Sequence, residues 1–584
     1  MNKDLLKIKK ECQKILKEKD KTSSRLSHLR LILFIIMFIT LFISLSTTNY
    51  IGLLIFIILL IIFIVIVVIH EKLIKLIKKQ EYYISIIDKY ENRYDDKWKE
   101  EPSENIDNLD NFINDLDIVN GNSLFKYLNF TKSLGSKKHL INSLSLKNKL
   151  SKKEICANQE AITELSKNHN FILELQYILN NIDKIEETDY KEYLYFFDNK
   201  KESSRVELII SIILSCLSII LALLAIFKIA PIYYFLLSMF IQLIHSHIYK
   251  LRYNNQLNTI DKCSKTFSDL NNIYDYISLQ NFNSSKNISL KENIVKGQKI
   301  LKEINKISDL NSLRFNFITN IIFTTFASLN FILVYRYNKL LSENINDFKP
   351  SITALEEYEL LISLSTINLV KENICTPKIV SDWSLKVDSV KHPLLKEKNC
   401  ISNNFASQKD LNIITGSNMS GKTSFMKTLG INLILAYNGA FVNAQTFTCP
   451  IAHIFTSINV KDDIGKGIST FYGELKRIKD ILTFSKKSND KMIIFIDEIF
   501  KGTNYNDRIL GAKETLNQLA SLNCLVFLTT HDFELCEINK KEIKNYHFSE
   551  KYKDDKIIFD YKIKEGKCQT TNAQYLMKQM GIIK

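Results

Sequence analysis

Glycine and proline are scarce in this chain, with 15 glycines and 6 prolines spread over 584 residues. Because both residue types interrupt helices, their scarcity predicts a protein dominated by long helices. The ten cysteines are scattered singly, without a C-x-x-C pair. This spacing argues against a zinc site and a disulfide framework, and it suits a reducing cytoplasm. No cleavable signal peptide is visible, because the first apolar stretch follows thirty mostly polar residues and has no small-residue cleavage site.

Positive charge is in excess, with 78 Lys and Arg against 63 Asp and Glu and a formal net charge of +15. This balance favours an anionic partner, for which nucleic acid and an acidic lipid surface are both candidates. The length allows three or four domains with cores of ordinary size. Composition alone therefore leaves the partner open.

A pair of long apolar runs, 31–45 and 51–69, follows a basic segment, 1–30, whose apolar positions share one helical face. Neither run contains a charge, and each is close to the length that crosses a bilayer core. Lys and Arg crowd the outer flanks, whereas the polar turn between the runs has none. The positive-inside rule then places both ends in the cytoplasm. The alternative is a buried helical hairpin in a soluble core.

A second pair of apolar runs, 206–227 and 230–249, predicts another membrane hairpin. Glu207 lies at its edge, and Gln242 and two histidines lie near its end, so this pair is the weaker candidate. The two histidines diverge around a helix, which favours interface histidines over a metal pair. Together the two hairpins predict four membrane-spanning helices.

A glycine loop between a strand and a helix carries the clearest chemistry. The apolar run 411–414 predicts a buried strand, and GSNMSGKT at 416–423 fits G-x-x-x-x-G-K-[ST]. In this pattern the loop N–H groups and the helix N-terminus hold phosphate oxygens. Lys422 is placed to reach the β- and γ-phosphates, and Thr423 to ligate magnesium. The expected nucleotide contacts are Gly416, Ser417, Asn418, Met419, Ser420, Gly421, Lys422, Thr423 and Ser424.

Two later apolar strands end in residues that suit phosphate chemistry. KMIIFIDEI, at 491–499, ends in paired acids, so Asp497 is expected to hold Mg²⁺ and Glu498 to polarise the attacking water. LVFLTT, at 525–530, ends at His531, the position of a γ-phosphate sensor. The predicted catalytic residues are Lys422, Glu498 and His531, and the predicted metal ligands are Thr423 and Asp497.

The segment 462–475, DDIGKGISTFYGEL, is polar and glycine-bearing before it becomes helical. Gly467, Ser469 and Thr470 are able to present N–H and hydroxyl groups to a phosphate. The site in the same chain is already served by Lys422, so we predict that these residues close the nucleotide site of a second subunit. This predicts a homodimer.

The run 313–334 is apolar enough for a fifth span, but Arg314 and three asparagines interrupt it. An odd number of spans would also place the nucleotide site outside the cell, where ATP is scarce. We therefore expect a buried core helix over 313–334. A separate helix is expected over 351–369, leading into the nucleotide-binding domain.

With these residues on the page, the chain resembles the MutS family of ATPases, whose best-known members recognise mismatched DNA. The resemblance rests on GSNMSGKTSFMKT, DDIGKGISTF, IDEIFKGTN, LTTHDFEL and KHPLL, which together cover about 390–584. Fainter similarity to the family's helical core and lever helices lies in 123–140, 158–165 and 358–367. The resemblance implies ATP and Mg²⁺ as cofactors, DNA as a partner, and Ser469 as the serine that contacts the partner's nucleotide.

The chain departs from the family in several places. The family's mismatch reader uses an N-terminal domain with a Phe-x-Glu wedge, whereas this chain has a basic helix and a membrane hairpin there. Its single Phe-x-Glu, at 548–550, lies in the ATPase domain, and we expect no nuclease-like extension after Lys584. At Asn158 the family often has arginine. We therefore expect a membrane-anchored branch of the family, with the second hairpin inserted in the core.

The expected fold is a C-terminal α/β P-loop (ABC-like) ATPase domain, preceded by an all-α core and lever domain and two transmembrane helical hairpins. The expected domains are a basic amphipathic helix (1–30), a first transmembrane hairpin (31–70), a charged helix and linker (71–108), a first part of the core (109–205), a second transmembrane hairpin (206–249), a second part of the core with its levers (250–374) and the ATPase domain (375–584).

The expected function is a Mg²⁺-dependent ATPase in the cell membrane, with its ATPase domain in the cytoplasm and no small-molecule substrate other than ATP. It is expected to work as a dimer with composite sites and to bind mismatched or otherwise structured DNA in repair or recombination. Two alternatives stay open. One is an ABC-like membrane ATPase acting on a protein or lipid partner, although no LSGGQ-type signature is present. The other is a nucleotide-gated scaffold that hydrolyses ATP slowly.

Overall fold

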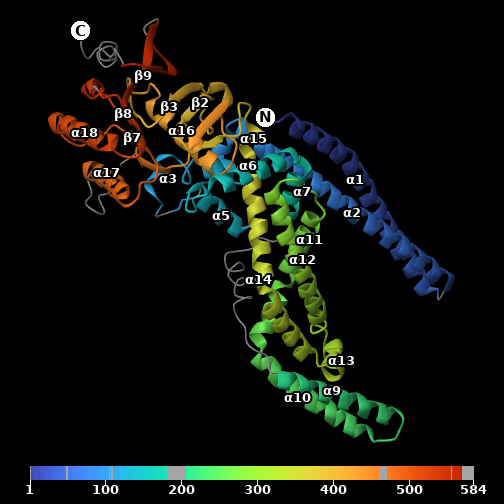
Figure 1. Cartoon of the computed structure of the whole chain (residues 1–584). Helices are drawn as coiled ribbons and strands as arrows, with labels where there is room; N and C mark the ends of the chain where they lie inside the picture. The colour runs from blue at the N-terminus through green and yellow to red at the C-terminus, as the bar shows by residue number, and fades with distance from the viewer. Residues whose placement is uncertain are drawn as a thin grey trace.

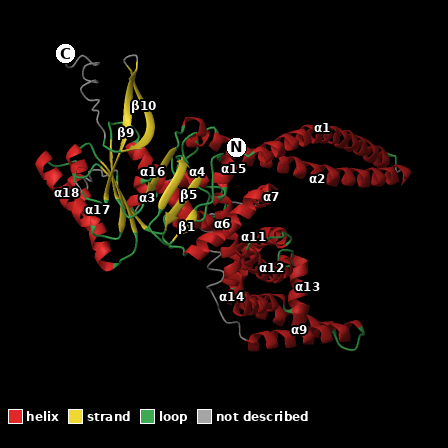
Figure 2. Cartoon of the chain, turned by 45° about the horizontal axis from the view of Figure 1, so that its top comes forward, coloured by secondary structure: helices red, strands yellow, loops and turns green. Residues whose placement is uncertain are grey.

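The computed structural model describes residues 2–47, 50–103, 105–106, 109–180, 205–458, 470–538, 540–553 and 556–567. A C-terminal α/β domain adjoins a helical body, from which one helical hairpin and a long helical arm extend, and a second hairpin lies at the far end of the arm (Figure 1). Within the described ranges, strands occur only in the C-terminal part, and the remainder consists of helices joined by loops (Figure 2). The scarcity of glycine and proline is consistent with the length of these helices.

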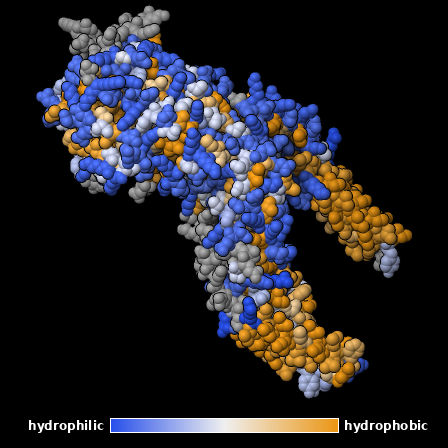
Figure 3. Space-filling model, in the orientation of Figure 1, coloured by the Kyte–Doolittle hydropathy of each residue, from blue (hydrophilic) through white to orange (hydrophobic). Residues whose placement is uncertain are grey.

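Helices α1 (Lys3–Ser46) and α2 (Tyr50–Tyr94) form the first hairpin. The basic segment and the first apolar run are one continuous helix, and α2 likewise joins the second apolar run to the charged helix after it. The far half of the hairpin exposes its apolar side chains, which give it an apolar surface along its length (Figure 3). The near half packs on the body, where Leu5 is buried and the Asn2 N–H donates to the Leu369 carbonyl at 3.0 Å.

The body and the arm are helical and share one continuous core. Trp98, Tyr127, Tyr274 and Tyr358 are among the largest fully buried side chains. The helices of the body are η1 (Lys97–Glu100), α3 (Asn111–Asp115), α4 (Leu124–Leu128), α5 (Leu134–Leu144), α6 (Lys152–Lys167), α7 (His169–Asn180) and α15 (Thr366–Val370), and those of the arm are α11 (Asn254–Ser278), α12 (Ser285–Ser312) and α14 (Leu329–Leu364).

The second hairpin consists of α9 (Arg205–Ile226) and α10 (Ile232–Arg252), and α13 (Phe317–Ala327) packs against both. Among the described residues, α1, α2 and α9 are long and apolar enough to cross a membrane. The pair formed by α13 and the start of α14 reaches this length and hydropathy only when taken together, and its bend fits either a broken span or a re-entrant loop. α10 carries Gln242, His245 and His247 and does not reach the same hydropathy. Length and composition thus support three of the four predicted spans.

The prediction of a single buried core helix over 313–334 is wrong. α13 ends at Ala327, Ser328 has a left-handed φ of 52°, and α14 leaves at an angle of 75°. The Asn316 side chain caps the start of α13, and the Ser328 hydroxyl donates to the Ser211 carbonyl of α9 at 2.8 Å. Contacts with the second hairpin therefore fix a break that the apolar pattern does not indicate.

The helix expected over 351–369 begins too late in that prediction. Pro350 lies inside α14, which starts at Leu329 and ends at Leu364. A proline inside a helix removes one backbone hydrogen bond and is tolerated where packing holds the helix. Here Ser351 lies against Gly297 of α12, where even a Cβ atom would not fit, and its hydroxyl lies 3.0 Å from the Tyr274 hydroxyl.

The α/β domain contains two sheets. The six-stranded sheet has the order β10-β9-β4-β8-β7-β6, and only β10 pairs antiparallel to its neighbour. Its strands are β4 (Leu411–Thr415), β6 (His453–Ser457), β7 (Met492–Asp497), β8 (Cys524–Thr529), β9 (Ile543–Lys553) and β10 (Lys556–Glu565). The four-stranded sheet, in the order β1-β5-β2-β3, contains β1 (Lys378–Val380), β2 (Leu385–Val390), β3 (Asn403–Ser407) and β5 (Thr446–Pro450).

Helix α16 (Lys422–Tyr437) joins this domain to the body, since every residue from Thr428 to Tyr437 is buried. Gly430 lies so close to Leu116 of the body that a Cβ atom there would be 2.8 Å from the leucine side chain. Lys427 pairs with Asp117 at 2.5 Å. The other elements of the domain are η2 (Glu397–Asn399), α17 (Thr470–Lys487), α18 (Tyr505–Ala520) and η4 (Phe533–Glu537).

Candidate nucleotide-binding site

The loop between β4 and α16 lies where ligands bind in parallel α/β sheets, at the carboxyl end of a central strand. Gly416 (φ 145°) and Gly421 (φ 108°) adopt backbone conformations that side chains disfavour, and Met419 also has a positive φ of 68°. At Gly416 a Cβ atom would lie 2.8 Å from the Phe548 carbonyl oxygen. The predicted glycines are thus required by the backbone geometry of this loop.

Lys422 is the first residue of α16, and its side chain is buried under the loop. Its Nζ donates to the carbonyl oxygens of Gly416 and Ser417, both at 2.9 Å, and lies 3.4 Å from His531 Nε2. The ammonium group is thus held inside the curled loop. An incoming phosphate would exchange neutral carbonyl partners for charged ones, which form stronger hydrogen bonds.

Thr423 and Asp497 lie together, as the metal-site prediction requires. The Thr423 hydroxyl donates to the Asp497 carboxylate at 3.0 and 3.2 Å, and Thr529 also donates to Asp497. A hydroxyl and a carboxylate are the hard oxygen donors that Mg²⁺ prefers, and Mg²⁺ is commonly held by one or two such groups together with substrate phosphates. The donor set therefore fits Mg²⁺.

Glu498 and His531 form the next pair. The Glu498 carboxylate lies 2.9 Å from His531 Nε2 and 3.1 Å from Lys501 Nζ. The hydrogen bond from His531, followed by the charge of Lys501, lowers the pKa of Glu498 to about 2. Glu498 has a φ of 54°, and its N–H donates to the Thr529 carbonyl at 3.0 Å. The turn after β7 thus directs an ionised carboxylate toward the histidine at the end of β8.

The structure describes only part of the segment that is predicted to close the nucleotide site of a second subunit. Gly467 and Ser469 lie outside the described residues, and Thr470 is the first residue of α17. Buried Glu474 of α17 accepts the backbone N–H groups of Phe500 and Lys501, and burial raises the pKa of its carboxyl group. The start of α17 is therefore fastened to the loop that follows Glu498.

The other predicted nucleotide contacts, in the loop between β4 and α16 and at the start of α16, differ in solvent exposure. Asn418, Met419 and Ser424 are exposed, whereas Ser417 and Ser420 are buried. The Ser417 hydroxyl donates to the Glu550 carboxylate of β9 at 2.8 Å. Its side chain therefore points toward the neighbouring strand.

Several residues of β9 and β10 beside the loop were missed by the sequence prediction. Phe548 lies under Gly416, Glu550 binds Ser417, and the Tyr561 ring lies close to Gly421. Tyr561 is 44% exposed, and the Asn403 amide donates to its carbonyl at 3.0 Å. Alternating aromatic residues indicate strands here, but only the pairing of β9 with β4 shows that these strands flank the phosphate loop.

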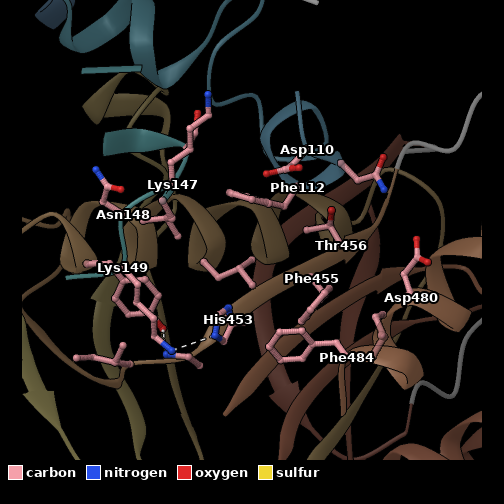
Figure 4. A pocket seen from close by; sticks show the side chains of 18 of the residues that line it. Asp110, Phe112, Lys147, Asn148, Lys149, His453, Phe455, Thr456, Asp480 and Phe484 are labelled. Atoms are coloured by element: carbon pink, nitrogen blue, oxygen red, sulfur yellow. Dashed lines mark hydrogen bonds between the residues drawn. The ribbon is translucent and has the colours of Figure 1, made fainter. Parts of the chain in front are cut away.

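A separate cavity of about 490 Å³ runs along the edge strand β6, between the helical body and the α/β domain (Figure 4). Phe112, Phe455 and Phe484 line it, and Lys149 lies 3.1 Å from His453 at its rim. None of its described lining residues belongs to the predicted nucleotide site. The phosphate loop and this cavity are thus different features of the domain.

Residues 412–582 match the family described as MutS domain V. The C-terminal region is thus similar to MutS domain V. The chain is also similar to two proteins named DNA mismatch repair protein MutS. It is 29% identical to that of Aquifex pyrophilus over 257 residues, which are 42% of this chain and 30% of the relative. It is 29% identical to that of Clostridioides difficile (strain 630) over 247 residues, 40% of this chain and 26% of the relative.

The chain thus matches less than a third of the length of these MutS relatives. The matched region supports a relationship to MutS, and the helical N-terminal part with mixed α/β sheets at the C-terminal end is consistent with MutS domain V. Both hairpins and the whole helical arm lie N-terminal to residue 412, where the family match begins.

Proposed function

We propose that this chain is a membrane-anchored, MutS-like ATPase that binds and hydrolyses ATP with Mg²⁺. The observation that carries the proposal is the meeting of three separate segments at the carboxyl edge of one sheet. Lys422 and Thr423 come from the loop after β4, Asp497 and Glu498 from the end of β7, and His531 from the end of β8. Their side chains lie within 3.4 Å of one another in pairs.

Each residue has a role that follows from its contacts. Lys422 exchanges its loop carbonyls for phosphate oxygens, and Thr423 and Asp497 hold Mg²⁺, which neutralises phosphate charge when bound. Glu498 is ionised at neutral pH, so it accepts a hydrogen bond from the attacking water and orients it. The Nε2 atom of His531 lies 2.9 Å from the Glu498 carboxylate and 3.4 Å from Lys422 Nζ. The histidine thus connects the water-orienting residue to the phosphate-binding residue.

The partners form the second part of the proposal. We propose a homodimer in which Gly467, Ser469 and Thr470 close the partner's nucleotide site, and DNA as the ligand of the helical arm. The names of the two relatives and the net charge of +15 support DNA. The apolar hairpins support anchoring in the cell membrane, with the ATPase domain in the cytoplasm.

Turnover of the purified full chain in phospholipid nanodiscs tests both parts. ATP hydrolysis is measured without DNA and with homoduplex, mismatched and branched DNA, at several salt concentrations. Stimulation by one DNA that weakens as salt rises supports the DNA-binding proposal. Turnover that no DNA changes would instead favour the ABC-like membrane ATPase with a protein or lipid partner. ATP binding without turnover would favour the nucleotide-gated scaffold.

A further inference from the structure

Helix α13 has its polar and apolar sides reversed relative to a helix on the surface of a soluble protein. Its exposed side chains are apolar, and Phe317 and Ile318 are 77% and 67% exposed. Its buried side chains are two threonines, Thr324 and Thr325. A helix in water buries its apolar face, so this arrangement fits an apolar solvent. The exposed apolar side chains of this element are Phe315, Phe317, Ile318, Ile322, Phe323 and Phe326.

The buried side of the break after α13 rests on neutral polar groups of the second hairpin. The Gln242 amide of α10 donates to the hydroxyls of Ser215 and Ser328 at 3.0 and 3.2 Å, and these two hydroxyls lie 2.6 Å apart. Asn330 donates to Ser246 at 2.8 Å. Interrupted helices are tolerated at membrane depth where such partners satisfy the freed polar groups. We call Ser211, Ser215, Gln242, Thr324 and Ser328 the serine–glutamine cluster.

The depth of this cluster can be estimated along α9. Glu207 pairs with Arg252 near the base of the hairpin, where charges suit the membrane surface. Along α9, Ser211 lies about 6 Å and Ser215 about 12 Å beyond Glu207, at 1.5 Å per residue. Helices that lie in the membrane interface are buried about 5–10 Å into the boundary of headgroups and acyl chains. The cluster therefore begins at the depth of the outer acyl chains and extends farther into the acyl region.

The chain enters and leaves this element on the same side of the hairpin. α12 ends at Ser312, and α14 runs back along it, so that Ser351 lies against Gly297 and the Tyr358 hydroxyl donates to the Asn287 carbonyl at 2.8 Å. The helices before and after α13 thus belong to one arm. A segment that crossed the membrane would leave them on opposite sides.

We propose that residues 315–328 form a re-entrant element whose exposed face contacts the acyl chains of phospholipids without crossing the bilayer. The inference rests on the proposed membrane anchoring, and its apolar face continues that of the second hairpin (Figure 3). This element would anchor one end of α14, a single helix of 36 residues, in the membrane. At its other end α14 leads through α15 into the α/β domain.

Lipid contact is tested with the full chain in sealed phospholipid vesicles that contain a phospholipid with a photoreactive diazirine in its acyl chain. Mass spectrometry then maps the labelled peptides. We expect labelling of 317–327 at a level similar to α9, and background labelling of α11. Labelled hairpins with an unlabelled α13 would overturn this inference and leave the anchoring proposal intact. Unlabelled hairpins would overturn both this inference and the anchoring proposal. If α13 is unlabelled but becomes labelled when the protein is diluted, a second copy of the chain covers it, and this inference is overturned.

A matched pair of variants separates lipid contact from folding. Ile322 on α13 and Ile288 on α12 are similarly exposed, at 46% and 40%. We expect Ile322→Asp to lose labelling of 317–327 because a charge is expelled from the acyl region, and Ile288→Asp to leave it unchanged. Loss of labelling in both variants, or in neither, contradicts the proposal.

Accessibility from one side tests the re-entrant path. Arg314→Cys, Arg336→Cys and Lys409→Cys add a thiol before α13, after it and in the ATPase domain, and an impermeant maleimide–polyethylene glycol reports each by a mass shift over wild type. We expect all three added thiols to react from the same side of sealed vesicles. Reaction of Arg314→Cys and Arg336→Cys from opposite sides would show a crossing segment and overturn the proposal.

Discussion

The proposed nucleotide site and the serine–glutamine cluster both join segments far apart in the sequence, but they use different chemistry. The proposed nucleotide site brings together the amine and carboxyl side chains of Lys422, Asp497 and Glu498 with neighbouring polar groups. The cluster on α9, α10 and α13 uses only hydroxyl, amide and carbonyl groups. Charge is useful where a charged ligand is handled, and it is costly inside an apolar solvent.

The helices beside these two clusters differ in the same way. α16 and α13 are both rich in apolar residues, yet α16 is buried by protein from Thr428 to Tyr437, whereas α13 exposes its phenylalanines and isoleucines. Apolar composition alone does not distinguish protein from lipid as the surrounding medium. The direction of the polar side chains does, because α13 turns its threonines toward the protein.

The largest expected effect concerns the charged cluster. Glu498→Gln removes the carboxylate that we propose orients the attacking water, while it preserves the size of the side chain. We expect turnover to fall by about 10²–10⁴-fold, the range for loss of a general base, with ATP binding retained. Single-turnover hydrolysis measures the rate of the chemical step, and equilibrium binding of a labelled ATP measures the affinity. Gln242→Leu, in the serine–glutamine cluster, is the control. An equal fall in turnover in both variants would show that the two clusters do not differ in their effect on hydrolysis.

Matched truncations test the two helices. Leu433 of α16 is fully buried, whereas Ile322 of α13 is 46% exposed. We expect Leu433→Ala to lower the free energy of unfolding by about 2–5 kcal/mol, because it leaves a cavity in packed protein. Ile322→Ala in detergent should change it by less than about 0.5 kcal/mol. Thermal unfolding of both variants in the same detergent measures the difference, and equal costs would show that α13 is packed against protein.

How much of this arrangement the sequence predicts depends on the kind of pattern. The phosphate loop and the strand ends at Asp497 and His531 follow from short motifs, since each motif requires a fixed backbone geometry next to it. The break at Ser328 has no such motif, because it depends on hydroxyl partners in α9. Tyr561 and Glu550 likewise become part of the site only through the pairing of β9 with β4.

A smaller effect, on the free energy of unfolding, is expected from substitutions in the serine–glutamine cluster. Gln242→Leu removes the amide that joins α10 to Ser215 and Ser328 but keeps an apolar side chain of similar volume. Hydrogen bonds between helices in membranes contribute about 0.6–2 kcal/mol, so we expect a loss in that range. Gln242→Glu should cost more, because it places an ionisable group there. Unfolding in detergent micelles measures both variants, and a stabilising Gln242→Glu would contradict a membrane location.

The smallest effect is a dependence of stability on pH in the charged cluster. The pKa of Glu498 is lowered to about 2, first by the hydrogen bond from His531 and then by Lys501. A carboxyl group with a lowered pKa contributes stability above its ordinary pKa of about 4.5, and this contribution is lost as the pH falls toward 2. His531→Asn removes the imidazole whose hydrogen bond is the largest cause of the lowered pKa of Glu498. Its destabilisation should therefore be larger at pH 7 than at pH 3, by less than about 1 kcal/mol because solvent screens a half-buried pair. Lys501→Ala should show the same sign with a smaller size, and a His531→Asn effect equal at both pH values would show that His531 stabilises the site by packing rather than by charge.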